Sequence, residues 1–314
     1  ITVRDSKKRI LQYYKNLGYY DVSVKTETQQ ISDKKILLKY LINPKSRYLI
    51  DSISSSIESS DLKNIYSKNK KNQKIKEGAP FEIEKFEEER ERLFLLFRNN
   101  GIYNFQQNSI QFTAAIDSTG QDLKIPVKIQ IDNIQQRIGD TLIKIPYTQF
   151  KVKDVVVFVD NIDFEDNLNQ YSDSIFYGNF NLFSKGKLKF NPKTITSGIS
   201  IKKGELYSDE DRNLTYRYFT NLKNFKYPSI NYSLISEEEN ALRASIYLSP
   251  KERFSLGFDL DLSHSNIQDF GIGLGGGLGI RNVFRGAELL ELNIKNTLGA
   301  SRDIAQKGDQ FFNL

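Results

Sequence analysis

The chain has 314 residues, with 45 lysines and arginines against 39 aspartates and glutamates, and a formal net charge of +6. No stretch approaches the roughly 20 consecutive apolar residues of a transmembrane helix, which excludes a helical membrane span. The absence of cysteine excludes a disulfide framework and a thiolate metal site.

Acidic and basic residues intermingle along the chain, which argues against a nucleic-acid-binding face and for a solvated surface. The small positive balance favours acidic partners or lipid headgroups. The densest basic run, from Lys68 to Lys76, is interpreted as a solvated linker beside a helix.

Residues 1–45 predict a helix followed by a hairpin. The helix covers residues 6–14 and ends near Gly18, which suits the left-handed turn after a helix. Strands start at Val22 and at residue 34. Because the chain opens without a signal peptide or a lipoprotein cysteine, we expect a fragment or a processed form.

Residues 46–134 predict a complete β-α-α-β-β module. Its elements are a strand at 47–57, a short helix at 62–68, a turn at 76–81, a helix at 82–98, and strands at 102–115 and 123–131. The second helix carries apolar Phe86, Leu93 and Phe97, and stops at Asn100-Gly101. We expect this apolar stripe to pack on the module's own sheet; the alternative is a partner-binding surface.

Residues 147–250 predict a second copy of the same order, and this internal repeat supports a tandem of modules. Its elements are a strand at 150–159, an irregular excursion at 161–186, a helix at 192–200, a turn at 203–208 that parallels 76–81, a helix through Leu214, Tyr218 and Leu222, and strands at 229–235 and 241–248. Ser208 is a candidate cap of the second helix, with acidic residues in its first turn.

Residues 254–296 show period-two alternation, in which successive side chains of a strand point to opposite faces. In the first segment five apolar residues alternate with small or acidic ones: Phe254, Leu256, Phe258, Leu260 and Leu262. In the second, Phe270, Ile272, Leu274, Leu278 and Ile280 share one parity, and glycines fill the other: Gly271, Gly273, Gly275, Gly277 and Gly279. In the third, Leu290, Leu292 and Ile294 alternate with polar residues.

Repetition at membrane-crossing length, with glycines that leave one face almost bare, favours a membrane barrel over one face of a soluble sandwich. A further strand starts at Phe311. Because a bacterial barrel needs at least about eight strands, residues 251–314 give only an incomplete barrel.

The turn between the second and third segments reads Arg281-Asn282-Val283-Phe284-Arg285-Gly286-Ala287-Glu288-Leu289. It resembles the periplasmic turn after the second barrel strand in the BamA/TamA superfamily of outer-membrane assembly factors. The likeness is greatest to the TamA-like (TamL) branch of Bacteroidetes, and its motif residues are Arg281, Asn282, Phe284, Arg285 and Gly286.

The resemblance covers most of the chain, because the β-α-α-β-β modules resemble POTRA domains. It implies an α+β fold of tandem POTRA modules followed by the first strands of a transmembrane antiparallel β-barrel. Residues 1–45 are then the C-terminal half of one POTRA module, 46–134 a complete module, 147–250 the last module with an insertion at 161–186, and 251–314 the barrel strands.

The resemblance also implies a function: a Gram-negative outer-membrane protein, its POTRA modules in the periplasm, that assists insertion of other outer-membrane proteins. In that superfamily the first barrel strand pairs weakly with the last, which leaves an edge for client strands. The matching residues are Phe254, Ser255, Leu256, Gly257, Phe258, Asp259, Leu260, Asp261, Leu262 and Ser263.

The implied partners are outer-membrane lipid, nascent β-barrel clients, and either a TamB-like periplasmic protein or assembly-machine lipoproteins, without nucleic acid. No nucleotide, other cofactor or enzymatic chemistry is implied. Three alternatives stay open: a BamA core subunit of the general assembly machine, a substrate-specific POTRA secretion channel, and a soluble β-rich binding protein.

Catalytic and metal-binding patterns are weak. His264 is the only histidine, so a histidine pair is excluded and a rim position at a strand end is expected. Gly271, Gly273 and Gly276 match G-x-G-x-x-G, but no helix is predicted after them to cradle a phosphate. Asp259 and Asp261 alone are too few for a calcium site.

Overall fold

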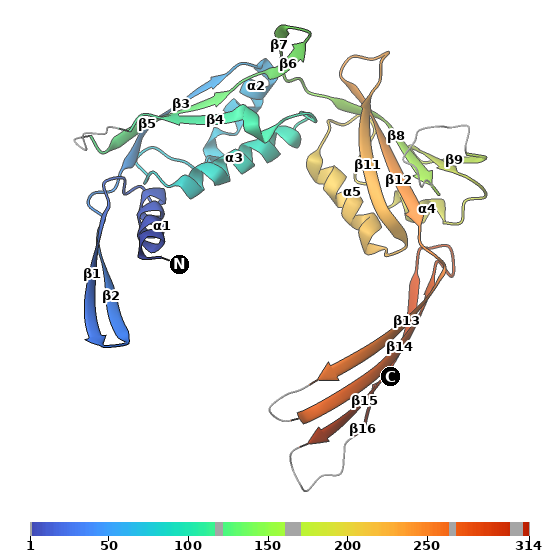
Figure 1. Cartoon of the computed structure of the whole chain (residues 1–314). Helices are drawn as coiled ribbons and strands as arrows, with labels where there is room; N and C mark the ends of the chain where they lie inside the picture. The colour runs from blue at the N-terminus through green and yellow to red at the C-terminus, as the bar shows by residue number, and fades with distance from the viewer. Residues whose placement is uncertain (1, 117–121, 161–170, 264–267, 302–309, 314) are drawn as a thin grey trace. The chain divides into compact units, whose positions relative to one another are not determined.

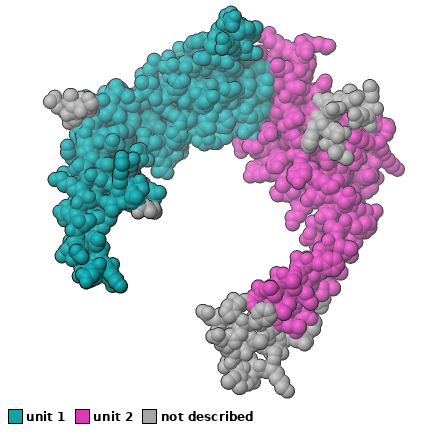
Figure 2. All heavy atoms as spheres, viewed as in Figure 1, with its two compact units in different colours: residues 1–150, 206–209 teal, residues 151–205, 210–314 magenta. Residues whose placement is uncertain are grey.

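The computed structural model describes residues 2–116, 122–160, 171–263, 268–301 and 310–313. The chain divides into two compact units, residues 1–150 with 206–209 and residues 151–205 with 210–314 (Figure 2). Both units combine helices with sheets, so the chain is mixed α/β, and Figure 1 labels most of the elements. No helix in the described ranges is long and apolar enough to cross a membrane.

Unit 1 opens with helix α1 (Val3–Asn16) and the antiparallel hairpin of β1 (Ser23–Ser32) and β2 (Lys35–Asn43). The helix begins with a capping box, in which the Asp5 amide donates to Thr2 Oγ1 (3.2 Å) and the Thr2 amide donates back to the Asp5 carboxylate (3.2 Å). It is followed by Gly18 at φ +89°, the predicted left-handed position.

The next elements of unit 1 follow the predicted β-α-α-β-β order. They are β3 (Leu49–Ile57), α2 (Ser60–Lys68), a 3₁₀ turn η1 (Lys70–Asn72), α3 (Ile83–Arg98), a 3₁₀ turn η2 (Gln107–Ser109), β4 (Ile110–Ala114) and β5 (Lys124–Ile131). The sheet order is β3-β5-β4, with β5 parallel to β3 and antiparallel to β4.

The two helices of this module supply the core over one face of its sheet. Phe86, Leu93 and Phe97 of α3 lie in one buried cluster with Ile125 and Ile129 of β5. The interpretation that the apolar stripe of residues 82–98 packs on its own module is therefore confirmed.

One prediction for unit 1 is wrong, and one of its elements is not predicted from the sequence. The strand expected at 102–115 begins only at Ile110, because Gly101 takes φ +96° and a loop follows, in which Ile102 and Phe105 are buried as core anchors. An unpredicted hairpin, β6 (Ile134–Ile138) and β7 (Thr141–Ile145), follows the module and turns at Gly139, φ +60°.

Unit 2 starts with a five-stranded sheet in the order β11-β12-β8-β10-β9. Its elements are β8 (Lys151–Val159), β9 (Asp173–Tyr177), β10 (Phe180–Ser184), α4 (Pro192–Thr196), α5 (Asp209–Asn221), β11 (Phe225–Leu234) and β12 (Ala241–Pro250). As in unit 1, the first and last strands of the module pair in parallel, here β8 with β12, and the last two strands pair antiparallel.

The repeat extends to the turn predicted in both modules. Gly78 (φ +76°) and Gly204 (φ +89°) both take the left-handed conformation. The Gly78 amide donates to Ile50 O (2.8 Å) and the Gly204 amide to Val152 O (2.6 Å). In each module the turn is thus bonded to the first strand, and glycine is used where a Cβ would be strained.

The irregular excursion predicted at 161–186 is wrong for its second half, and residues 161–170 lie outside the described residues. β10 pairs in parallel with β8, and β9 pairs antiparallel with β10. Aromatic residues explain this: the rings of Phe183 and Tyr247 lie 5.6 Å and 5.3 Å from the ring of Phe158, covering the sheet face opposite the helices. The helix predicted at 192–200 is also shorter and ends at Thr196.

The last part of unit 2 is a separate antiparallel sheet of β13 (Phe254–Ser263), β14 (Gln268–Arg281), β15 (Leu289–Ser301) and β16 (Gln310–Asn313). Three longer strands and the start of a fourth were expected here. The register pairs residues of like parity, Leu256 with Leu278 and Leu278 with Leu292, so each face of the sheet keeps one chemical character.

Candidate functional site

The ten residues predicted as a client-binding edge form β13, the first strand of the four-stranded sheet. Within the described residues β13 pairs with β14 on one side only, so its other edge presents free backbone donors and acceptors. The structure places these residues at an edge, and their role stays a prediction.

One face of this sheet is apolar and exposed. Phe258 is 87% exposed, Leu256 74% and Leu260 66%, although most large apolar side chains of a folded domain are buried. The face continues across β14 and β15 through Ile272, Leu274, Leu278, Leu290, Leu292, Ile294 and Leu298. An exposed apolar surface of this extent marks an interaction site with lipid or protein.

The opposite face is polar, and its middle strand is almost without side chains. Gly273 and Gly275 of β14 lie opposite Asp261 and Asp259 of β13. Across this bare strand Lys295 of β15 forms an ion pair with Asp261, although β13 and β15 are not neighbours. The glycines therefore let charged side chains from the flanking strands meet over β14.

The turn after β14 fastens this sheet to the α/β part of unit 2. Arg281 donates through Nε to Lys223 O (3.3 Å), and through Nη1 to Glu252 O (3.2 Å) and Ser255 Oγ (3.2 Å). The guanidinium thus joins the segment after α5 to the start of β13.

Asn282, the second motif residue, closes the turn and ties it to the segment after β10. Its Nδ2 donates to Lys189 O (3.0 Å), and its Oδ1 accepts from the Ala287 amide (3.1 Å). It takes φ +55°, a conformation that asparagine tolerates better than most residues.

Arg285 forms the third attachment. Its Nη2 donates to Leu188 O (2.9 Å), and its own carbonyl accepts from the Asn191 amide (2.7 Å) at the N-cap of α4. Arg285 also takes a positive φ, +66°. The turn is therefore strained in its backbone and held by several hydrogen bonds to one wall of the module.

Ala287 and Asn224 complete the attachment, and the sequence pattern singled out neither as functional. Ala287 is 4% exposed and belongs to the core cluster of the five-stranded module. Its carbonyl accepts from Asn224 Nδ2 (2.5 Å), and Asn224 is 2% exposed. An asparagine three residues after a helix gives no signal of a partner more than sixty residues later in the chain.

The motif residues thus differ in what they do. Arg281, Asn282 and Arg285 bond to the module, and the Gly286 amide donates to Glu288 Oε1 (3.0 Å) within the turn. Phe284 is 83% exposed. The resemblance groups all five, but the structure gives a fixing role to the polar ones.

The weak catalytic patterns come out as follows. His264 lies outside the described residues. Gly271, Gly273 and Gly276 lie inside β14, which runs into a turn. Among the described residues no three His, Cys, Asp or Glu side chains gather to hold a metal ion.

No protein-family profile matches the sequence, and no curated protein sequence matches it either. Solved structures that it resembles include BamA from Haemophilus ducreyi lacking POTRA domains 1–3, with 11% identity over 80% of this chain and a TM-score of 0.48. POTRA domains 3–5 of Haemophilus influenzae BamA align with 12% identity over 79% of this chain and 80% of theirs, TM-score 0.38. CdiB from Acinetobacter baumannii aligns with 14% identity over 94% of this chain and 46% of its own, TM-score 0.34.

The chain spans 39% of the length of the Haemophilus ducreyi BamA structure. These identities and scores are too low to place the chain in a family.

Proposed function

We propose that this chain is the periplasmic and early barrel part of an outer-membrane assembly factor of the TamA-like type. In this proposal β13 to β16 begin a transmembrane β-barrel and the α/β modules lie in the periplasm as POTRA domains. Client β-strands add to the free edge of β13. The work is done by backbone pairing, without a nucleotide, a metal or bond-making chemistry.

The single observation that carries the proposal is that β13 combines an edge that is unpaired within the described ranges with an exposed apolar face. Its 10 residues, and the 14 and 13 of β14 and β15, reach or exceed the about 9–11 that a tilted strand needs to cross a bilayer. In hydrocarbon each unpaired backbone group costs several kcal/mol, so an open edge there is a strong template for an incoming strand.

The turn supports the same proposal. If client strands pull on β13, its position relative to the modules has to be held. Arg281 bonds to the carbonyl before β13 and to Ser255 inside it. Such hydrogen bonds suit a sheet whose edge strand binds and releases client strands.

A cross-linking experiment in vesicles tests this edge. The 314 residues contain no cysteine, so Asp259→Cys supplies the only thiol within them, on the polar face of β13. Any cysteine elsewhere in the full-length protein is replaced by serine. A client carrying one cysteine in its terminal strand is added while it folds into the vesicles. We expect a disulfide whose yield depends on the client residue chosen, because strand pairing has a register.

Thr297→Cys is the matched control. Thr297 lies on the same polar face of the sheet, but β15 is paired there with β14 through Gly273 and with β16 through Phe311. Equal cross-linking at Asp259→Cys and Thr297→Cys would contradict strand addition at β13.

Depletion of the full-length protein, followed by quantitative proteomics of the outer membrane, separates the functional alternatives. A narrow loss of barrel proteins, or altered envelope lipid with barrels intact, supports the TamA-like proposal with a TamB-like partner. A broad loss indicates a BamA core subunit with accessory lipoproteins. Loss of a single exported substrate indicates a secretion channel and overturns the insertion proposal.

A further inference from the structure

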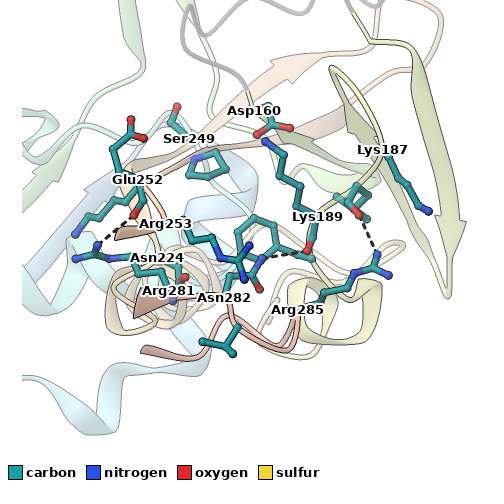
Figure 3. Close-up of a pocket in the computed structure, with 15 residues that line it drawn as sticks. Asp160, Lys187, Lys189, Asn224, Ser249, Glu252, Arg253, Arg281, Asn282 and Arg285 are labelled. Atoms are coloured by element: carbon teal, nitrogen blue, oxygen red, sulfur yellow. Dashed lines mark hydrogen bonds between the residues drawn. The ribbon is translucent and has the colours of Figure 1, made fainter. Parts of the chain in front are cut away.

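A cavity of about 930 Å³ lies where the four-stranded sheet meets the module of unit 2 (Figure 3). Its walls are Asp160 after β8, the segment after β10, Asn224, the end of β12 with the chain that leads to β13, and the turn after β14. The volume is that of a site for a small molecule or a headgroup.

The lining of this cavity is strongly basic. Among the described residues that line it, six are cationic and two are acidic; the cations are Lys187, Lys189, Lys251, Arg253, Arg281 and Arg285, and the acids are Asp160 and Glu252. Glu252 is also 3.9 Å from the Lys226 ammonium, which is not part of the lining. The cavity therefore attracts an anion.

Two of these cations are held in place by uncharged partners, and neither forms an ion pair among the described residues. The Arg281 and Arg285 guanidinium groups donate to carbonyl oxygens and a serine hydroxyl, as described above. A carbonyl accepts a hydrogen bond but carries no full charge, and a guanidinium has five N–H donors, so charge and donors remain for a ligand.

Two others have side chains that the fastening does not use. The Lys189 backbone carbonyl accepts from Asn282, while its ammonium is free of that bond. Arg253 lies with its guanidinium carbon 5.7 Å from the centroid of the Phe254 ring. Lys187, in contrast, points away from the other labelled side chains in Figure 3.

The position of the cavity indicates that its anionic ligand also has an apolar part. Arg253 directly precedes Phe254, the first residue of the exposed apolar face, which is itself 61% exposed. Basic side chains thus adjoin the point where an exposed hydrophobic surface begins. A molecule with an anionic head and an apolar tail fits both, and basic clusters beside membrane segments bind anionic lipid headgroups.

We propose that this cavity binds the phosphate headgroup of an anionic phospholipid, with its acyl chains along the apolar face of β13 and β14. The lipid as the source of the phosphate rests on the proposed membrane position of this sheet. Lys189 and Arg253 contribute the charge, and Arg281 and Arg285 shape the site.

Native mass spectrometry of the detergent-solubilised full-length protein tests the site without requiring membrane insertion. The probes are short-chain phosphatidylglycerol, short-chain phosphatidylcholine and inorganic phosphate, each as a soluble molecule. We expect phosphatidylglycerol to be retained more than phosphatidylcholine. In Lys189→Gln/Arg253→Gln that retention falls by about tenfold or more, because two of the cationic side chains that attract the phosphate are removed.

The control double variant, Lys193→Gln/Lys203→Gln, removes the same charge from two exposed positions outside the cavity. It should retain phosphatidylglycerol like the unmodified protein. Equal retention of the two lipids, or an equal fall in both double variants, would overturn the proposal. If inorganic phosphate displaced phosphatidylglycerol at equal concentration, the acyl chains would add nothing, and the lipid assignment would be wrong.

Failure of the lipid site and failure of strand addition give different results in these experiments. Preferential binding of phosphatidylglycerol with no cross-link at Asp259→Cys would keep the lipid site and overturn strand addition. The reverse result would keep strand addition and overturn the lipid site.

Discussion

β12 and β13 follow each other in the chain and are both rich in apolar residues, yet they are used in opposite ways. In β12 seven of ten residues are buried, and Leu242, Ala244, Ile246 and Leu248 have no exposed surface. In β13 all ten residues have accessible surface, and nine of them are exposed. β12 lies between two strands of a sheet covered on both faces, whereas β13 is at the edge of a sheet whose apolar face has no cover among the described residues.

The difference teaches that apolar content does not define a core. β12 has apolar residues at adjacent positions, which suits a strand buried on both sides, whereas β13 alternates strictly and keeps one polar face. An exposed apolar face of this kind is a contact surface for another molecule. The proposals above name a bilayer and a client strand.

The largest expected effect comes from a substitution in β12, the buried strand. Leu242→Ala should lower the free energy of unfolding of the module by about 2–5 kcal/mol, because it removes a fully buried side chain and leaves a cavity. Urea unfolding followed by far-UV circular dichroism in detergent measures it. Leu260→Ala, at a 66% exposed position, should change the same quantity by less than about 0.5 kcal/mol.

A smaller effect tests how the two sheets are fastened. Asn224→Ala removes the donors to Leu222 O (2.8 Å) and Ala287 O (2.5 Å) and leaves a buried carbonyl without its partner. We expect the free energy of unfolding to fall by about 1–3 kcal/mol. The backbone amides of residues 282–288 should exchange their hydrogens faster than in the unmodified protein.

Phe284→Ala is the control for that experiment. Its side chain is 83% exposed, so the substitution should change little. The free energy of local opening that hydrogen exchange gives for residues 282–288 should stay within about 0.5 kcal/mol of its value in the unmodified protein. Equal effects of the two substitutions would mean that the turn is held by something other than its polar contacts.

A still smaller effect is expected from alanine substitutions that compare the two faces of β14. A Cβ at Gly273 would lie 3.3 Å from Asp261 Cβ and 3.4 Å from Thr297 Oγ1, whereas a Cβ at Gly276 would meet nothing closer than a carbonyl oxygen at 4.0 Å. Gly273→Ala should destabilise the sheet by about 1 kcal/mol relative to Gly276→Ala, which should be neutral or slightly stabilising. Urea midpoints in detergent compare them, and a more stable Gly273→Ala would show that the polar face has room to spare.

The smallest expected effect concerns pH in unit 1. A hydrogen bond from Lys144 Nζ (2.8 Å) and another from the Asn133 amide (2.9 Å) lower the pKa of the Glu58 carboxyl from its usual value. The folded-state pKa is thus below the unfolded one, so this contribution is present above the unfolded pKa and is lost as pH falls through the folded pKa.

Nuclear magnetic resonance titration of the Glu58 carboxyl measures that shift. In Lys144→Gln the pKa should move up toward its ordinary range, because the largest cause of the lowering is gone. An unchanged pKa would assign the shift to the Asn133 amide alone.

Several features of this protein are determined by local sequence. Period-two alternation from Phe254 onward predicted the strands and their two faces, since side-chain direction alternates in any strand. The helical period of Phe86, Leu93 and Phe97 predicted a helix with its apolar stripe on the module, and Gly18 predicted the positive φ of the turn after the first helix.

Contacts between distant segments decided the rest. Nothing local predicted that β10 would pair with β8, because that pairing depends on Phe183 finding Phe158 across the sheet. The loop at 102–109 reads as strand because its apolar residues fill a core that other elements create. Arg253 and Lys189, far apart in the chain, line one cavity only once the turn at Asn282 has bonded to the module. Local propensity and periodicity depend on a few neighbouring residues, whereas a cavity and an edge depend on where separate segments meet, and only the folded chain specifies that.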